Sequence, residues 1–320
     1  MYHDRHVTII IPALNEAPSI GRVLEELLTL SVCRRCTHPI DNNADKIAHT
    51  AAAGTSPSLL QELRNVARTD AAKTQSCTCE EGNTNAGQLV DQIIVCDNGS
   101  TDDTAAIADA CGAIVVEEPV RGYGAACLAA LAAPVEKDLI VFVDADHSVV
   151  ATELPSLLDP IMSGAQLVIG SRTLGQCEKG ALSIPQALGN QLASALMRLL
   201  WRAKVTDLGP FRAVTNDALT AMKMSDKQFG WTVEMQIRAY QLPIKTVEVP
   251  VSTTKRIGKS KISGTVRGVI GAAHGILGTI FKLYWRQISG AHKRIQLHEQ
   301  RSLATAMHAE PANEHTQKSS

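Results

Sequence analysis

The stretch LIVFVDAD, residues 139–146, is an unbroken apolar run that ends in two carboxylates separated by one alanine. A short run of this kind, rich in β-branched residues, is typical of a strand that is buried on both faces. Asp144 and Asp146 stand where that strand ends, so the strand can direct both carboxylates at one divalent cation. Mg²⁺ or Mn²⁺ suits such ligands and completes its coordination with phosphate oxygens and water. Because a lone Asp-x-Asp is common on protein surfaces, its context must decide its meaning.

Apolar segments of the same kind recur along the chain. They lie at residues 7–11, 92–96, 113–116 and 167–169. Helical patterns lie between them, at residues 19–28, 101–110, 123–132 and 154–162. This alternation predicts an α/β fold with a mostly parallel sheet flanked by helices. Farther on the alternation is lost, and we expect helices at 185–201 and 231–240, a strand at 244–249 and an apolar helix at 265–285.

Polar residues follow the predicted strands at their carboxyl ends. Asn15 and Glu16 follow the first strand and Asp97 follows the second, just as the two acids of LIVFVDAD follow theirs. Ligands of open parallel sheets bind at this edge, so these side chains are candidates for one site. Helix capping is the alternative for the hydroxyls and acids at residues 100–103, which precede a helical pattern.

Three motifs appear in order on successive strand ends: IPALNE at 11–16, DNGSTD at 97–102 and DAD at 144–146. Together they resemble family 2 glycosyltransferases of the GT-A, Rossmann-like fold, over roughly residues 7–285 apart from an insertion. The resemblance implies an enzyme that moves a sugar, with inversion, from a UDP- or GDP-sugar. It also assigns expected roles: nucleotide binding for Pro12, Asn15, Glu16 and Asp97, and Mg²⁺ or Mn²⁺ binding for Asp144 and Asp146, with Asp146 counted among the catalytic residues.

Two further segments resemble phosphate-binding parts of the family. The RGYGAA stretch at 121–126 is similar to a glycine loop near the donor, with Tyr123 where a second basic residue is usual. Arg121 is therefore the expected cation of that loop, although a glycine turn that opens a helix explains the same residues. Arg172, which closes the strand at 167–169, is expected near the sugar or the diphosphate.

The acceptor side is less sharply defined. The DLGPFR and GWTVEM stretches, at 207–212 and 230–235, resemble acceptor-side segments of the family. A hydroxyl acceptor needs a general base, for which Glu234 or Asp207 is the candidate. Trp231 fits a sugar-stacking wall or a core position equally well. His147, where many relatives have glycine, could join the metal shell or be a solvated or hydrogen-bonded loop histidine.

The basic segment RIGKSK, residues 256–261, carries the acceptor hypothesis. It is similar to a segment of dolichyl-phosphate mannose and glucose synthases that closes over phosphates, which implies phosphate contacts for Arg256, Ser260 and Lys261. A polyprenyl-phosphate acceptor is already ionised and needs no general base. The alternatives are a soluble hydroxyl acceptor and a non-catalytic nucleotide-binding protein.

Composition limits the class of protein. The 31 basic and 32 acidic residues nearly cancel, so no global field indicates a nucleic-acid partner. No apolar span reaches the roughly 20 residues that cross a bilayer. The helix at 265–285 nevertheless has the composition of an interfacial helix, or of one packed on the domain. No signal peptide is evident, so we expect a cytoplasmic protein, peripheral on the membrane face if that helix binds lipid.

The expected domain organisation is a single glycosyltransferase domain at 1–290 and a disordered polar tail at 291–320. Residues 33–87 interrupt the alternation and are interpreted as an insertion. Four cysteines within it could bind zinc, although the spacing of the second pair is shorter than zinc ribbons prefer; the alternative is a flexible insertion. These are Cys33, Cys36, Cys77 and Cys79.

Overall fold

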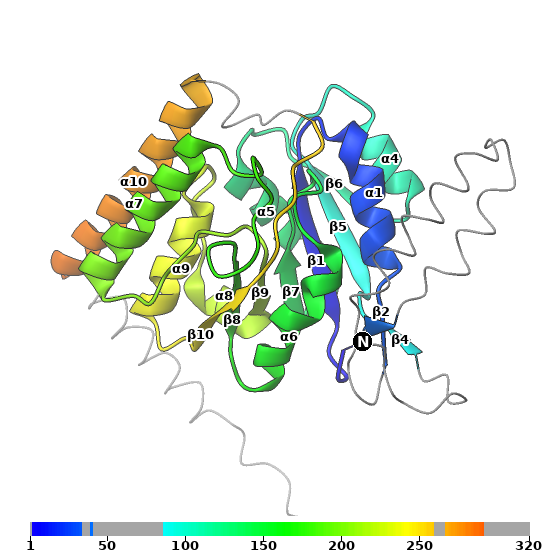
Figure 1. Ribbon diagram of the computed structural model, residues 1–320, viewed down its shortest axis with the longest axis horizontal. Coiled ribbons are helices and arrows are strands. Elements are labelled where there is room, and N and C mark those ends of the chain that lie inside the picture. Colours follow the sequence, from blue (N-terminus) through cyan, green and yellow to red (C-terminus); the bar gives the residue numbers. More distant parts are fainter. Residues whose placement is uncertain (1, 34–38, 41–85, 259–265, 291–320) are drawn as a thin grey trace, which may run out of the picture.

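The computed structural model describes residues 2–33, 39–40, 86–258 and 266–290. Its centre is a seven-stranded sheet with the strand order β10-β8-β9-β7-β1-β5-β6 (Figure 1). The strands are β1 (Val7–Ala13), β5 (Gln92–Asp97), β6 (Ile114–Glu117), β7 (Leu139–Phe142), β8 (Leu167–Ser171), β9 (Arg212–Thr215) and β10 (Thr246–Pro250). Every neighbouring pair is parallel except the two that involve β9. The predicted mostly parallel sheet is confirmed.

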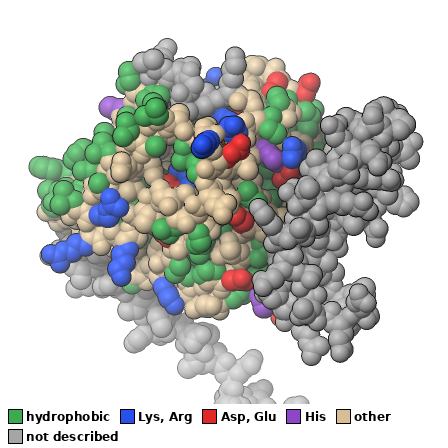
Figure 2. Space-filling model, in the orientation of Figure 1, with side chains coloured by type: hydrophobic (Ala, Val, Ile, Leu, Met, Phe, Trp, Pro, Cys, Tyr) green, Lys and Arg blue, Asp and Glu red, His purple; other side chains and the backbone are tan. Residues whose placement is uncertain are grey.

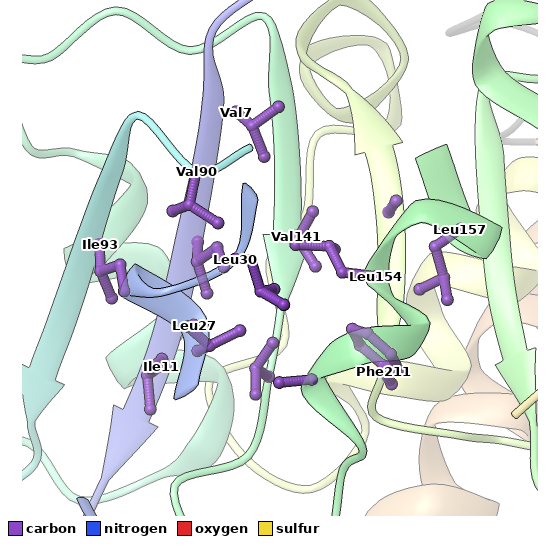
Figure 3. Close-up of a cluster of buried hydrophobic side chains, with 14 of the residues drawn as sticks. Val7, Ile11, Leu27, Leu30, Val90, Ile93, Val141, Leu154, Leu157 and Phe211 are labelled. Carbon is purple, nitrogen blue, oxygen red and sulfur yellow. The ribbon is translucent and has the colours of Figure 1, made fainter. Parts of the chain in front are cut away.

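Helices cover both faces of the sheet, and the alternation of side chains along each strand supplies both cores. Ile9 and Ile11 of β1 pack in the layer of α1 (Ala17–Leu28), α4 (Thr104–Ala110), η2 (Ala151–Glu153) and α6 (Leu154–Met162), part of which Figure 3 shows. Ile10 packs in the opposite layer, with α5 (Tyr123–Leu131), α8 (Asn216–Met222) and α9 (Trp231–Gln241). Each fully buried isoleucine contributes about 1.5–3 kcal/mol, so this alternation fixes the register of the central strand.

Two long helices lie side by side beyond α9, at one flank of the molecule (Figure 1). They are α7 (Ile184–Trp201) and α10 (Val266–Ile288). Helix α7 begins in a capping box in which Ser183 and Gln186 bond each other's backbone N–H groups. Met197 of α7 and Ile280 of α10 are buried together with residues of α9 in a third core. The two helices are thereby fixed against α9.

A small antiparallel sheet lies near the amino ends of β1 and β5. It has the order β3-β2-β4 and consists of β2 (Ser31–Cys33), β3 (Pro39–Ile40) and β4 (Ala86–Gln88). Cys33 pairs with Ala86 in this ladder, so both ends of the predicted insertion meet there. The hypothetical zinc set falls mostly outside the described residues, as does the polar tail.

Besides the small sheet and η2, strand β9 and helix α8 are absent from the sequence prediction. Strand β9 starts with an arginine, so it lacks the continuous apolar run by which the other buried strands were predicted. Helix α8 follows it directly. The expected apolar helix at 265–285 also needs correction, because α10 is amphipathic: Ile280 and Leu283 are buried, whereas His274, Lys282 and Arg286 are exposed. Among the described residues, none of the helices has the length and apolarity needed to cross a bilayer.

Candidate active site

A cavity of about 550 Å³ opens at the carboxyl ends of the central strands. Pro12 and Ala13 of β1, Asn98 after β5, Asp144 after β7 and Gly170 of β8 all line it. Open parallel sheets bind ligands at this edge, because consecutive loops leave the sheet there in opposite directions. The cavity continues outward between α7 and α10, which gives it one polar end and one apolar end.

The two acids of LIVFVDAD lie together in the polar end. Asp146 is 5% exposed and accepts a 3.0 Å hydrogen bond from the Ser148 N–H. Asp144 accepts one of 3.3 Å from the Tyr123 hydroxyl. Burial, and after it the neighbouring Asp146, raises the pKa of Asp144 to about 7 against the opposing effects of Arg256 and Arg172. Two carboxylates held this close favour the binding of a cation between them.

Arg256 is the cation that Asp146 contacts. Its guanidinium lies 3.0 Å from a carboxylate oxygen of Asp146, and the N–H of the next residue, Ile257, donates to the Asp146 carbonyl at 2.9 Å. The basic segment therefore reaches the acid pair through Arg256, whose expected contact with phosphate stays a prediction. Ser260 and Lys261 lie outside the described residues.

Arg172 and Asp207 form a buried pair on one wall of the cavity. Asp207 has no exposed surface, and its carboxylate accepts from the Arg172 Nε and NH2 atoms at 2.8 and 2.7 Å and from the Arg172 backbone N–H at 2.8 Å. Arg172 lines the cavity, whereas Asp207 lies behind it. Asp207 thus holds an arginine toward the cavity, and its carboxylate is not available to a hydroxyl acceptor.

The residues expected around the nucleotide divide into two groups. Pro12 and Glu16 line the cavity, whereas Asn15 and Asp97 do not. Asn15 accepts a 2.7 Å hydrogen bond from the Thr101 N–H, and Asp97 accepts one of 3.2 Å from the Ser100 N–H. The first bond joins the loop after β1 to the loop after β5, and the second lies within the loop after β5, so both bonds help to shape the wall.

Capping accounts for part of the polar stretch at 100–103. Asp102 accepts hydrogen bonds of 3.2 Å from the Thr104 N–H, in the first turn of α4, and from the Ala17 N–H, in the first turn of α1. Those bonds lower the pKa of Asp102 against the effect of burial, which raises it. The capping alternative is therefore the better interpretation of Asp102.

The glycine loop does not form a cradle of free backbone amides. The Gly122 N–H donates to the Asn98 side chain at 2.7 Å, and the N–H groups of Gly124 and Ala125 donate to backbone carbonyls of residues 228 and 227. Phosphate recognition by those three amides is therefore excluded while these bonds persist. Arg121 lines the cavity and remains the candidate for a phosphate contact from this loop.

Glu234 lies away from the cavity, contrary to the expectation that it faces the acceptor. It is 2% exposed, and its carboxylate accepts from the Ser225 N–H and hydroxyl, the Asp226 N–H and the Arg238 Nε at 2.7–3.0 Å. Burial alone would raise the pKa of Glu234, but these donors outweigh it and the pKa lies below its usual value. A carboxylate so engaged anchors a loop and is a poor general base.

Two alternatives left open by the sequence are decided by geometry. Trp231 is 1% exposed and packs edge-on against Phe142 with ring centroids 6.0 Å apart, so it is a core residue. His147 has a φ of 61°, a conformation that glycine adopts without strain, and its Nε2 atom lies 2.8 Å from a carboxylate oxygen of Glu26. The hydrogen-bonded interpretation of His147 is therefore favoured over a metal ligand.

Sequence reasoning missed the apolar end of the cavity. Side chains of α7, of the residues just before it, of α10 and of the loop before α9 form this end, including Leu182, Pro185, Phe229, Val269 and Ile276. Periodicity identified both helices but could not tell which faces oppose each other across a cavity, because that depends on how the helices pack.

Comparison with known proteins agrees with the fold and the motif order. The sequence profile of glycosyl transferase family 2 matches residues 81–220. The chain is 37% identical to an uncharacterised glycosyltransferase of Mycobacterium tuberculosis over 182 aligned residues. The alignment covers 56% of this chain and 81% of that protein. It is also 30% identical to undecaprenyl-phosphate mannosyltransferase of Micrococcus luteus over 194 aligned residues, which cover 57% of this chain and 78% of that protein.

Among solved structures, the chain is similar to glucosyl-3-phosphoglycerate synthase of Mycobacterium tuberculosis in complex with Mn²⁺, UDP and glucosyl-3-phosphoglycerate. The TM-score is 0.56, the identity is 22%, and the match covers 88% of this chain and 80% of that one. This likeness supports the expected GT-A fold. The profile match and the identity to relatives establish more: the chain belongs to glycosyl transferase family 2 and is a glycosyltransferase.

Proposed function

We propose that this enzyme transfers a sugar, with inversion, from a UDP- or GDP-sugar to a polyprenyl phosphate. The observation that carries the proposal is a single cavity that runs from an acidic end at Asp144 and Asp146 to an apolar end between α7 and α10. Under this proposal the nucleotide diphosphate binds at the first end and the prenyl chain at the second. The catalytic domain under this proposal is residues 1–290.

Mg²⁺ or Mn²⁺ is the proposed cofactor, and the acid pair fits it. Two carboxylates share one wall of the cavity, where burial and then the neighbouring Asp146 raise the pKa of Asp144. Oxygen ligands of this kind suit hard divalent cations. When bound, the ion would neutralise the charge that develops on the departing diphosphate. Arg256 already contacts Asp146, so it is well placed to contribute to the same neutralisation.

The carboxylates of Asp207 and Glu234 are already hydrogen-bonded to donors of the protein, which supports a phosphate acceptor over a hydroxyl acceptor. A hydroxyl must lose its proton to a nearby base, and both candidate bases are committed to other partners. A phosphate monoester, whose second pKa is about 6, is ionised near neutral pH and needs no base. Its oxygen forms the new bond to the anomeric carbon as the bond to the diphosphate breaks, and the nucleoside diphosphate leaves with both electrons of that bond. Arg121, Arg172 and Arg256 are proposed to hold the phosphates.

The experiment is a transfer assay with UDP- and GDP-sugars, Mn²⁺ or Mg²⁺, and two acceptors, a polyprenyl phosphate and 3-phosphoglycerate. We expect a glycosylated lipid by mass spectrometry, and loss of the product when the metal is chelated. Transfer to 3-phosphoglycerate alone would replace the lipid acceptor with a soluble one, as the name of the structural neighbour suggests.

Peripheral membrane contact is proposed through α7 together with α10. Apolar side chains gather on the flank where these helices lie, and basic side chains gather below them (Figure 2). The exposed apolar residues are Ile184, Leu188, Leu192 and Leu199 of α7 and Ile270, Phe281, Trp285 and Ile288 of α10. Neither helix contains an aspartate or glutamate. An apolar face with basic neighbours suits an anionic lipid surface.

Vesicle binding tests this contact. The Phe281→Ser, Trp285→Ser double variant is expected to bind vesicles of phosphatidylglycerol and phosphatidylcholine about tenfold more weakly than the parent, because two exposed aromatic rings no longer enter the interface. Ile114→Ser removes an exposed apolar residue at the far edge of the sheet and serves as the control. Equal binding by all three proteins would contradict the contact.

A further inference from the structure

The loop of residues 225–230, called here the 225–230 loop, links three parts of the molecule. Its first link is to α9, where the Glu234 carboxylate accepts from the N–H groups of Ser225 and Asp226 at 3.0 and 2.7 Å. Arg238, one turn later, contacts the same carboxylate at 2.8 Å. These bonds hold the start of the loop rigidly on the first turns of α9.

The second link is to the donor side of the cavity. The Lys227 carbonyl accepts from the Ala125 N–H at 3.0 Å, and the Gln228 side chain donates to the Arg121 carbonyl at 3.0 Å. At Gly122 and Gly124 the contact is so close that an added Cβ would collide with backbone oxygens of the loop. The loop is therefore part of the wall that sets the position of the Arg121 and Tyr123 backbone.

The third link is to α10. Asp226 accepts from the Thr279 hydroxyl at 2.9 Å through one oxygen, and from the N–H groups of Gln228 and Gly230 through the other. Thr279 is 7% exposed. Phe229 lies against Gly275 of α10 and lines the cavity. Movement of α10 must therefore move the loop, because side-chain bonds and packing both join them.

The two ends of the cavity consequently share one rigid element. The 225–230 loop contributes Gln228 and Phe229 to the cavity wall, α10 contributes Val269 and Ile276, and the loop touches the donor-side glycines directly. We propose that Thr279 and Asp226 are positioning residues that couple occupancy of the apolar end of the cavity to nucleotide affinity at the polar end. This rests on the proposed function, in which a prenyl chain occupies the apolar end.

Coupling of this kind is reciprocal and measurable as a change in affinity. Calorimetry would give the Kd of UDP and of GDP with Mn²⁺, with and without farnesyl phosphate, and the Kd of farnesyl phosphate itself. For the parent protein we expect farnesyl phosphate to tighten nucleotide binding by about fivefold or more, the lower end of typical coupling. We define the coupling ratio as the nucleotide Kd without farnesyl phosphate divided by the nucleotide Kd with it. Thr279→Val should reduce this ratio to below about twofold, while the nucleotide Kd without farnesyl phosphate stays within about twofold of the parent value.

Two variants separate positioning from a general loss of packing. Thr279→Ser keeps the hydroxyl and should restore the parent ratio. Ser194→Ala removes another buried hydroxyl, one on α7 for which the described part of the chain offers no hydrogen-bond partner, and should leave the ratio unchanged. A Thr279→Val protein that keeps the parent ratio overturns the coupling, as does a parent protein that binds farnesyl phosphate with no change in nucleotide affinity. Failure of farnesyl phosphate to bind overturns the proposed acceptor and the coupling together.

Discussion

Asp146→Ala is expected to lower kcat/KM for sugar transfer by about 10³-fold, equivalent to roughly 4 kcal/mol of transition-state stabilisation. The side chain is nearly buried in the polar end of the cavity, next to Asp144 and in contact with Arg256. Its loss removes one proposed ligand of the divalent cation and leaves Arg256 without its carboxylate partner. Both changes weaken the neutralisation of the leaving diphosphate, so kcat should fall more than the nucleotide Kd changes.

The measurement is steady-state transfer together with calorimetric titration of Mn²⁺. Asp146→Asn keeps an oxygen that can accept from the Ser148 N–H, so it tests charge with less disturbance of the fold. Asp138→Ala is a matched control, because Asp138 stands at the amino end of the same strand, where its carboxylate accepts a 2.8 Å bond from the His6 N–H. Full activity in Asp146→Ala would mean that the acid pair has another role.

Glu234→Gln is expected to lower the free energy of unfolding by about 2–4 kcal/mol at neutral pH while leaving the chemical step largely intact. The buried carboxylate accepts from four donors and pairs with Arg238, whose own side chain is 19% exposed. An amide cannot satisfy the same donors, and removal of one partner from a mostly buried ion pair is costly. If Glu234 were instead the general base, kcat would fall about 10²-fold or more with little loss of stability.

The same variant has a defined pH dependence. The pKa of Glu234 lies below its ordinary value of 4.5, so ionisation of this group stabilises the folded protein above that pH. The stabilisation is lost as the pH falls through the lowered pKa. Urea unfolding of parent and variant should therefore differ most near about pH 7 and converge as the pH falls below about 4. Glu25→Gln, an exposed change on α1, serves as control; a difference that is independent of pH would contradict this account.

The central sheet and the position of the acid pair could be predicted because each depends on a short stretch of consecutive residues. Buried strands read as continuous apolar runs, and the residue after a parallel strand must lie at the binding edge. Strand β9 escaped detection because it is short, begins with an arginine and runs against its neighbours. Its arginine, Arg212, is 1% exposed and is bonded to backbone carbonyls, so a charged residue occupies a core position.

The roles of Asp207 and Glu234 could not be predicted for a different reason. Both are acids in segments that resemble acceptor-side motifs, yet hydrogen-bond donors of the folded chain engage the carboxylate of each. Asp207 meets Arg172 from the strand 35 residues earlier, and Glu234 meets the 225–230 loop. Which acids are free to act depends on their hydrogen-bond partners, and single-sequence patterns do not record such partners.

The pairing of Cys33 with Ala86 gives the chain a practical property. The two residues are neighbours on adjacent strands at the opposite end of the sheet from the cavity, so the two ends of the intervening segment lie side by side (Figure 1). A foreign domain whose termini lie close together could replace that segment and find its anchor points already in place. This junction is therefore a natural site for fusing a fluorescent reporter or a crystallisation chaperone to the enzyme.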